Sequence, residues 1–231
     1  MSVQDPNAGF GLIIFDCDGV LVDSEPVISA AHVAVLGECG YRTTGRELLD
    51  RFTGVPEPEV LATLERESGL RFPASYHARV SAQIDRAFDA ALEAMPGMRE
   101  LLIRLRTRRC VASSGPPERV RRSLERTGLL EFFDPNIFTA SMVARGKPAP
   151  DLFLHAAGSL RTDPGRCLVV EDSPAGVRAG VAAGMAVIGF CGGSHCRTGH
   201  AAALLEHGAG AVVATAGELG EALAASCGVS A

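Results

Sequence analysis

Two pairs of acidic residues follow two apolar segments of the chain. Asp16 and Asp18 come directly after the apolar run 10–15, and Glu171 and Asp172 come directly after the run 167–170. One Asp-x-Asp pair alone is ambiguous, because Asp and Gly commonly end strands in turns. Two such pairs at neighbouring strand ends would gather three or four carboxylates, which repel one another unless a cation lies between them. The spacing therefore predicts a Mg²⁺ site.

Two further segments offer groups that bind anions. Ser113 and Ser114 follow the apolar run 110–112 and precede a helix expected from Pro117, and a helix N-terminus with free amides and hydroxyls suits an anion. Lys147 is the only lysine among the 22 basic residues. Its presence in an arginine-rich sequence could be due to chance. Alternatively, it supplies a compact positive charge to a phosphate oxygen at a site where a guanidinium would not fit.

The elements that would position these residues alternate along the chain. Short apolar runs predict strands, and the stretches between them have helical spacing. The expected strands are 10–15, 110–112, 137–138, 167–170, 186–190 and 211–213, and the expected helices are 98–107, 117–127, 151–157, 174–183, 201–207 and 217–225. Strands that alternate with helices indicate an α/β fold with a doubly wound, Rossmann-like parallel sheet.

A helical insertion interrupts this alternation. Between Asp23 and Met95 the sequence has no convincing strand and has helical patterns at 25–38, 44–50, 57–68 and 75–94. We therefore predict an α/β core of residues 1–24 and 96–231 and a helical cap of residues 25–95. Ligands bind open α/β sheets at the carboxyl ends of their strands, so an insertion after the first strand would act as a lid on the substrate.

Four segments of this chain, in order, resemble the four motifs of the haloacid dehalogenase superfamily. They are Asp16-Cys17-Asp18-Gly19-Val20, Ser113, Lys147 and Glu171-Asp172-Ser173-Pro174-Ala175-Gly176. The resemblance covers nearly the whole chain, including an insertion of the expected size between the first two motifs. The residues of the first and last motifs are similar to those of the subgroup that contains phosphoglycolate phosphatase, β-phosphoglucomutase and phosphogluconate phosphatases.

The resemblance implies the roles of the acidic residues. Asp16 would attack phosphorus and form an aspartyl-phosphate, and Asp18 would act as general acid and then as general base. Mg²⁺ would be held by the Asp16 carboxylate, the Asp18 main-chain carbonyl and Asp172. Glu171 would be a further direct or water-mediated ligand.

The resemblance also implies how the phosphoryl group would be held. Ser113 and Lys147 would contact its oxygens through their side chains, and Cys17, Asp18 and Ser114 would contact them through their amides. The substrate would be a small phosphate ester.

The superfamily catalyses several reactions, and single residues of this chain indicate which of them it can carry out. Asp18 argues against dehalogenation, because a halide leaving group needs no proton. Phosphonoacetaldehyde hydrolases use a cap lysine, and the region 23–95 has none. β-Phosphoglucomutases carry a histidine and an arginine where this chain has Ile28 and Glu57. Hydrolysis by a phosphatase is therefore favoured, and a phosphomutase and a catalytically silent binding protein remain the alternatives.

Composition narrows the partners and the location. The net charge of −5, with acidic and basic residues interspersed, indicates no nucleic-acid or anionic-membrane surface. No export signal or long apolar stretch is evident, and the seven cysteines have no regular spacing, so we expect free thiols in a reducing cytoplasm. Cysteines within apolar runs, namely Cys110, Cys167 and Cys191, are expected in the core.

The roles of two groups of residues remain open. Arg42, Arg46 and Arg51 in the insertion could read a second anionic group of the substrate or could be solvated helix faces. Cys191, His195, Cys196 and His200 follow an apolar run and include zinc-type ligands. Their spacing matches no common closed zinc site, so a Gly-rich turn is the favoured explanation.

Overall fold

The computed structural model describes residues 9–52 and 57–226. The chain divides into two compact units, one formed by Met1–Asp23 with Glu93–Ala231 and the other by Ser24–Leu92. The first unit contains a six-stranded sheet flanked by helices. The described part of the second unit contains helices and no strand. None of the helices in the described part of the chain has the length and apolar character needed to span a lipid bilayer.

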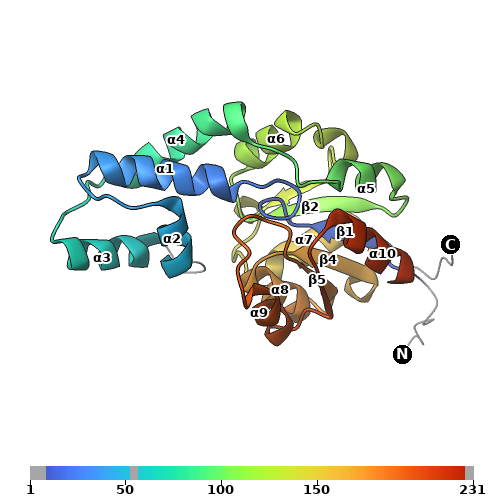
Figure 1. Cartoon of the computed structure of the whole chain (residues 1–231). Helices are drawn as coiled ribbons and strands as arrows, with labels where there is room; N and C mark the ends of the chain where they lie inside the picture. Colours follow the sequence, from blue (N-terminus) through green and yellow to red (C-terminus); the bar gives the residue numbers. More distant parts are fainter. Residues whose placement is uncertain (1–8, 53–56, 227–231) are drawn as a thin grey trace. The chain divides into compact units, whose positions relative to one another are not determined.

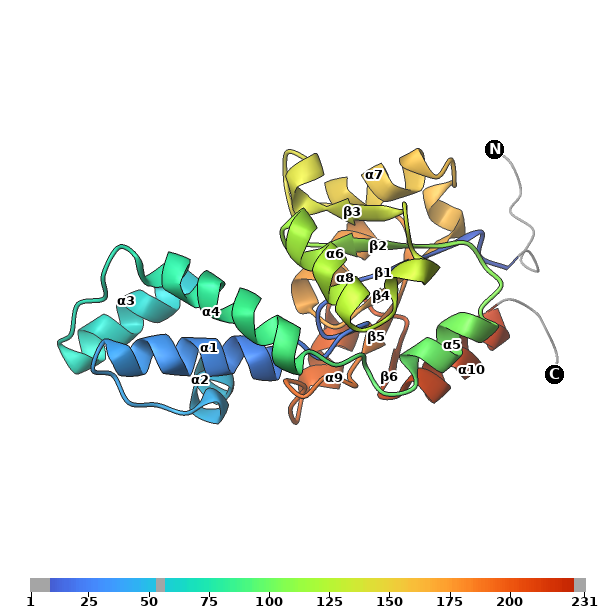
Figure 2. The ribbon, with the colours of Figure 1, turned by 90° about the horizontal axis from the view of Figure 1, so that it is seen from above.

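The sheet of the first unit is parallel throughout. Its strands are β1 (Leu12–Phe15), β2 (Arg109–Ser113), β3 (Ile137–Thr139), β4 (Cys167–Glu171), β5 (Ala186–Phe190) and β6 (Ala211–Val213). They lie in the order β3-β2-β1-β4-β5-β6, which Figure 2 shows from above. This order confirms the predicted doubly wound α/β fold. Its direction reverses between β1 and β4, and ligands of such sheets bind in the crevice at this switch point.

Helices cover both faces of the sheet. Figure 1 shows α5 (Met98–Arg104) and α6 (Pro117–Arg126) on one side, and α8 (Pro174–Ala182) and α9 (His200–Glu206) on the other. α7 (Asp151–Ser159) shares a buried cluster with α8, α9 and the strand residues Leu12 and Ile14. α10 (Ala216–Ser226) packs against α5.

Burial on both faces explains the continuous apolar runs of the sequence. Successive side chains of a strand point to opposite faces, so Ile13 and Phe15 face away from the cluster that holds Leu12 and Ile14. Phe15 makes an edge-to-face contact with Phe133, with ring centroids 5.8 Å apart. A strand that is covered on both sides has no solvent face on which polar residues would alternate.

The second unit is a group of helices. It consists of α1 (Glu25–Glu38), α2 (Gly45–Phe52), α3 (Glu57–Ser68) and α4 (Tyr76–Ala91). α1 and α4 lie side by side (Figures 1 and 2), and His32 Nδ1 lies 3.0 Å from the Tyr76 hydroxyl. Arg79 pairs with Glu38 across the same two helices. Glu57, which the comparison with mutases singled out, is the first residue of α3, and its side chain is not described.

Candidate active site

A cavity of about 210 Å³ lies at the carboxyl ends of β1, β2 and β4. It is lined by Asp16, Asp18, Ser113, Ser114, Lys147, Glu171, Asp172 and Ser173. The carboxyl ends of parallel strands meet at one edge of a sheet, which is why residues more than a hundred positions apart face one space. Every predicted site residue except Cys17 lines this cavity. The Cys17 side chain is fully buried in the core, and its predicted role involved only its amide.

A tight loop after β1 fixes the two aspartates. The Cys17 carbonyl accepts hydrogen bonds from the amides of Leu21 and Val22, and the Gly19 amide donates to the Val22 carbonyl at 2.8 Å. Gly19 has a φ of +77°, a conformation that favours glycine. A Cβ at this position would lie only 1.8 Å from Asp172 Oδ2, so the loop approaches Asp172 as closely as a residue without a side chain can.

The ammonium group of Lys147 is fully engaged. Nζ lies 2.6 Å from Asp16 Oδ1, 2.6 Å from Glu171 Oε1 and 2.9 Å from the Ala112 carbonyl oxygen. These three acceptors match the three hydrogens of an ammonium group. Lys147 thus holds two carboxylates in place, and its contact with a phosphoryl oxygen stays a prediction. It binds only one oxygen of Asp16 and thereby leaves Oδ2 for another partner.

Glu171 is held by donors on both oxygens. Oε1 accepts from Lys147, and Oε2 accepts from the amide and the hydroxyl of Ser173, each at 2.9 Å. The Ser173 hydroxyl oxygen also accepts from the Gly176 amide at 3.0 Å and so caps α8. A Cβ on Gly176 would lie 1.8 Å from Glu171 Oε1. The carboxylate therefore fits against the first turn of α8 and has little freedom to move.

Two histidines contact Asp172. His195 Nε2 lies 2.9 Å from Asp172 Oδ2, and His200 Nε2 lies 2.6 Å from the Asp172 carbonyl oxygen. His195 lies in the loop after β5 and His200 is the first residue of α9, and β5 is the neighbour of β4 in the sheet. The side chain of Asp172 is thus directed by one histidine and its backbone is held by the other.

The end of β2 supplies hydroxyl groups to the cavity. Ser113 is buried, and its Oγ accepts a hydrogen bond from the Gly115 amide at 3.0 Å. Its hydroxyl hydrogen remains to be donated to another acceptor. Ser114 is exposed and follows directly at the entrance to α6. This end of the cavity can therefore donate hydrogen bonds to an anion.

The charges of the cavity call for a cation. Burial raises the pKa of Asp16 well above its usual range, and Glu171 and Asp172 raise it further although Lys147 opposes them. The pKa of Asp172 is raised in the same way, by burial and then by Glu171 and Asp18. Burial lowers the pKa of Lys147, but Asp16 and Glu171 outweigh it and raise that pKa overall. One ammonium faces several carboxylates, so the excess is negative.

The donor set fits a hard cation. Ligand oxygens of Asp16, Glu171 and Asp172 lie within 4.8 Å of one another. Carboxylate and carbonyl oxygens suit Mg²⁺. Because both Glu171 oxygens already have donors, Asp16 and Asp172 are the carboxylates best placed to reach such an ion directly.

Comparison with known proteins decides the family. Residues 10–184 match the family model described as haloacid dehalogenase-like hydrolase. This chain belongs to that hydrolase family. A 6-phosphogluconate phosphatase from Escherichia coli is 35% identical over 184 residues, which are 79% of this chain and 83% of that protein. A phosphatase of phosphorylated carbohydrates from Thermotoga maritima is 35% identical over 180 residues, 75% of this chain and 81% of that protein.

A solved structure agrees over nearly the whole chain. A conserved haloacid dehalogenase-like protein of unknown function from Agrobacterium tumefaciens superposes with a TM-score of 0.87 and 38% identity. The match covers 94% of this chain and 99% of that one. Within the haloacid dehalogenase-like family, the chain is a phosphoric monoester hydrolase.

Several residues of this haloacid dehalogenase-like site were not predicted from the sequence. His195 was considered only as a possible metal ligand in its loop, and Ser173 and Gly176 were read only as part of a motif. A sequence signal exists for Ser173, because a serine directly before a proline that opens a helical stretch is the pattern of a helix N-cap. No comparable signal exists for His195, since its contact with Asp172 depends on β5 lying beside β4.

Proposed function

We propose that this protein is a Mg²⁺-dependent phosphatase of small phosphorylated sugars or sugar acids that works through an aspartyl-phosphate on Asp16. The observation that carries the proposal is the contact between Lys147 Nζ and Asp16 Oδ1, at 2.6 Å, inside a cavity that Asp18 also lines. The contact occupies Asp16 Oδ1 and leaves Oδ2 as the oxygen that can attack a substrate. Buried carboxylates on rigid strand ends make a well-oriented nucleophile.

The proposed reaction has two steps. In the first, Asp16 Oδ2 attacks phosphorus, the bond to the ester oxygen breaks, and Asp18 gives its proton to the departing alkoxide. In the second, Asp18 takes a proton from water as that water attacks the aspartyl-phosphate, and phosphate and the Asp16 carboxylate are released. Ser113, Ser114 and neighbouring amides would donate to the phosphoryl oxygens, where charge develops.

Mg²⁺ would be held by the carboxylates of Asp16 and Asp172 and by the Asp18 main-chain carbonyl. When bound, it supplies positive charge between the anionic nucleophile and the anionic phosphoryl group. Glu171 would act through water, because Lys147 and Ser173 already donate to its two oxygens.

We assign the helical unit Ser24–Leu92 the role of a lid that selects the substrate. Its insertion directly after the β1 loop supports this assignment. Of the arginines considered for a second anionic group, Arg51 is paired with Glu47 and Glu67 within the unit, whereas the side chain of Arg42 is exposed. Arg46 is exposed as well, so Arg42 and Arg46 are both better candidates than Arg51 to bind an anionic substrate.

The test is a panel of phosphorylated sugars, sugar acids and polyols, with release of inorganic phosphate measured with and without Mg²⁺. We expect Mg²⁺-dependent release from sugar phosphates and none from the Asp16→Asn variant. Asp16→Asn protein that retained more than a few per cent of the activity would exclude Asp16 as nucleophile. Asp18→Asn protein, given a substrate labelled in its phosphoryl group, should accumulate label on Asp16.

A mutase makes the same intermediate and differs in what accepts the phosphoryl group. Supplying a hexose 1-phosphate separates the two: a phosphatase releases phosphate, whereas a mutase yields the 6-phosphate isomer. Isomer formation without free phosphate would overturn the proposal. Absence of phosphate release from every member of the panel would favour a silent binding protein.

A further inference from the structure

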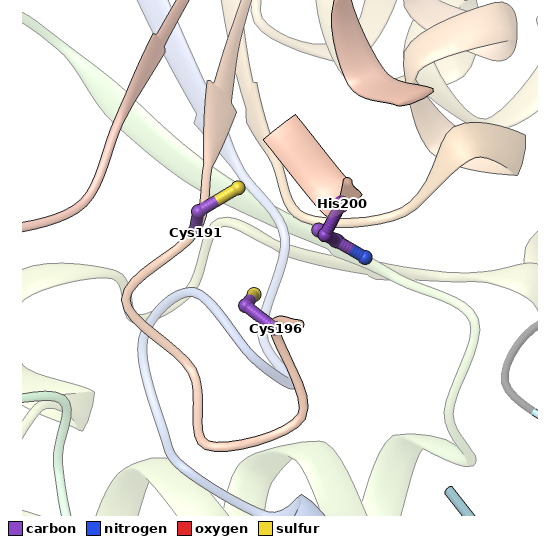
Figure 3. Close-up of side chains that lie close together, drawn as sticks. All are labelled: Cys191, Cys196 and His200. Atoms are coloured by element: carbon purple, nitrogen blue, oxygen red, sulfur yellow. The ribbon is translucent and has the colours of Figure 1, made fainter. Parts of the chain in front are cut away.

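Two cysteines of the loop after β5 and the first residue of α9, a histidine, come together outside the catalytic cavity. Cys191 directly follows β5, Cys196 lies in the loop, and His200 is the first residue of α9. Figure 3 shows the two sulfur atoms and the imidazole ring coming from these three places to one small region. The two sulfur atoms and a ring nitrogen of His200 all lie within 4.8 Å of one another. The sequence favoured a glycine-rich turn at this place, and the path of the chain here brings the three residues together.

The protonation of His200 suits a metal ligand. Its Nε2 lies 2.6 Å from the Asp172 carbonyl oxygen, and a carbonyl oxygen can only accept a hydrogen bond. Nε2 therefore carries the hydrogen, and the lone pair is on Nδ1. Histidines that bind metals commonly donate their other ring N–H to a backbone carbonyl or carboxylate, which fixes both the tautomer and the ring orientation.

The loop is also held in place from outside the cluster. The amide and the hydroxyl of Ser194 donate to Asp23 Oδ1, at 3.2 and 2.9 Å. A Cβ on Gly192 would lie 2.5 Å from the Phe190 ring, and a Cβ on Gly193 would lie 2.6 Å from the His195 ring. The backbone is thus packed closely on both sides of the turn that carries the cysteines.

The chemistry of the cluster selects a different ion from that of the cavity. Thiolate and imidazole ligands favour Zn²⁺, whereas the oxygen ligands of Asp16 and Asp172 favour Mg²⁺. Tetrahedral Zn²⁺ with Zn–S bonds of about 2.3 Å places two sulfur ligands about 3.8 Å apart, so the cluster needs to contract by no more than about 1 Å. Burial raises the pKa of the Cys196 thiol to about 12, so an ion binding there would displace protons.

We propose that Cys191 Sγ, Cys196 Sγ and His200 Nδ1 form a Zn²⁺ site, with a fourth position open to water, that is separate from the catalytic Mg²⁺ site. Through the hydrogen bond from His200 to Asp172, this ion would hold the backbone of a catalytic carboxylate. Through the loop, it would also hold His195 against the Asp172 side chain. The Zn²⁺ site is therefore a structural brace behind Asp172.

Cobalt(II) is the probe, because thiolate ligands give bound Co²⁺ a charge-transfer absorption that carboxylates do not. Full-length protein, reduced and stripped with chelator, is titrated with Co²⁺ in a large excess of Mg²⁺, which occupies the oxygen site. We expect one Co²⁺ per chain with this absorption, and its displacement by one equivalent of Zn²⁺. The Asp16→Asn variant should show the same absorption, so this result is independent of the proposed phosphatase mechanism.

Single substitutions locate the ligands. Cys191→Ser and Cys196→Ser should each abolish the thiolate absorption or weaken Co²⁺ binding by more than the 10–100-fold typical of losing an outer-sphere contact. The matched control is Cys39→Ser, because Cys39 is a partly buried free thiol that lies in the helical unit. This variant should bind Co²⁺ as the unsubstituted protein does.

A measurement on the unsubstituted protein keeps the proposal testable if a variant fails to fold. Zn²⁺ should slow alkylation of Cys191 and Cys196 and leave the rate at Cys39 unchanged, as followed by peptide mass spectrometry. Absence of the thiolate absorption would overturn the proposal, as would its persistence in both cysteine variants. Rapid closure of a Cys191–Cys196 disulfide in air, at equal rates with and without Zn²⁺, would also overturn it and indicate a redox pair.

Discussion

His195 Nε2 lies 2.9 Å from Asp172 Oδ2, so a residue of the β5–α9 loop directs a carboxylate at the end of β4. The same oxygen is the atom that a Cβ on Gly19 would meet. Asp172 is therefore confined between the loop after β1 and the loop after β5. A carboxylate held in this way is oriented toward the cavity before any ligand arrives.

The contact predicts that His195 sets the apparent affinity for Mg²⁺. His195→Ala should raise the Mg²⁺ concentration needed for half-maximal activity by about 10–100-fold, as is usual when an outer-sphere partner of a metal ligand is lost. His195→Gln, whose amide nitrogen can reach the position of Nε2, should recover part of the loss. The control His207→Ala removes a histidine that bonds only within its own helix end, and it should not change the Mg²⁺ dependence. Equal Mg²⁺ requirements in all three variants would contradict the prediction.

The close approach of Gly19 to Asp172 predicts that Gly19→Ala disturbs catalysis as well as stability. Gly19→Ala combines a strained backbone, at φ +77°, with a collision against Asp172 Oδ2. Gly184→Ala is the matched control, because Gly184 has a φ of +73° and a Cβ there would meet no atom within 4 Å. Gly184→Ala should lose about 1–2 kcal/mol in the free energy of unfolding, the usual cost of a left-handed conformation, and Gly19→Ala should lose more because of the collision. Only Gly19→Ala should lose most of its turnover, measured at saturating substrate.

Much of the sheet and of its site could be predicted because buried parallel strands have a recognisable sequence pattern. Strands covered on both faces read as continuous apolar runs, and polar residues begin where each strand ends. Asp16, Ser113 and Glu171 are such first polar residues. Their meeting in one cavity then follows from the shared edge of a parallel sheet.

Other features depend on contacts that have no local signal. The neighbours of a strand are set by the packing of the whole domain. The contact between His195 and Asp172 could therefore not be predicted from the sequence of the loop that contains His195. The ion pairs of Lys147 with both Asp16 and Glu171 likewise depend on three segments that are far apart in the sequence. The cluster of Cys191, Cys196 and His200 has a spacing of no common motif and forms through the path of the β5–α9 loop.

The environment of Lys147 predicts that arginine cannot replace it. Its side chain is only 4% exposed, and its three bonds converge on one compact nitrogen. A guanidinium is planar and larger, so Lys147→Arg should retain the charge yet reduce turnover at least a hundredfold, by the usual sensitivity of catalysis to displacement of about 1 Å. Arg145→Lys, at a side chain that is 71% exposed and pairs with Asp151, is the control. That exposed pair should contribute at most about 1 kcal/mol, and its variant should keep full activity.

The buried carboxylates predict how Mg²⁺ and pH act together on stability. Burial, followed by neighbouring carboxylates, raises the pKa of both Asp16 and Asp172 in the folded protein without metal. In the unfolded chain an aspartate has a pKa of about 3.9. Above that pH the folded state keeps protons that the unfolded chain has released, so the metal-free protein loses stability as the pH rises toward the folded pKa values. Below pH about 4 both states are protonated at these positions, and the loss disappears.

Bound Mg²⁺ should reverse this trend, because it requires both carboxylates to be ionised and competes with their protons. Thermal unfolding followed in chelator and in saturating Mg²⁺ should show a small difference in Tm at acidic pH and a growing difference as the pH rises. The double variant Asp16→Asn/Asp172→Asn should lose both the Mg²⁺ effect and this part of the pH dependence, since an amide does not titrate. A stabilisation by Mg²⁺ that is equal at every pH would mean that the ion binds elsewhere, and it would remove Asp16 and Asp172 as its ligands.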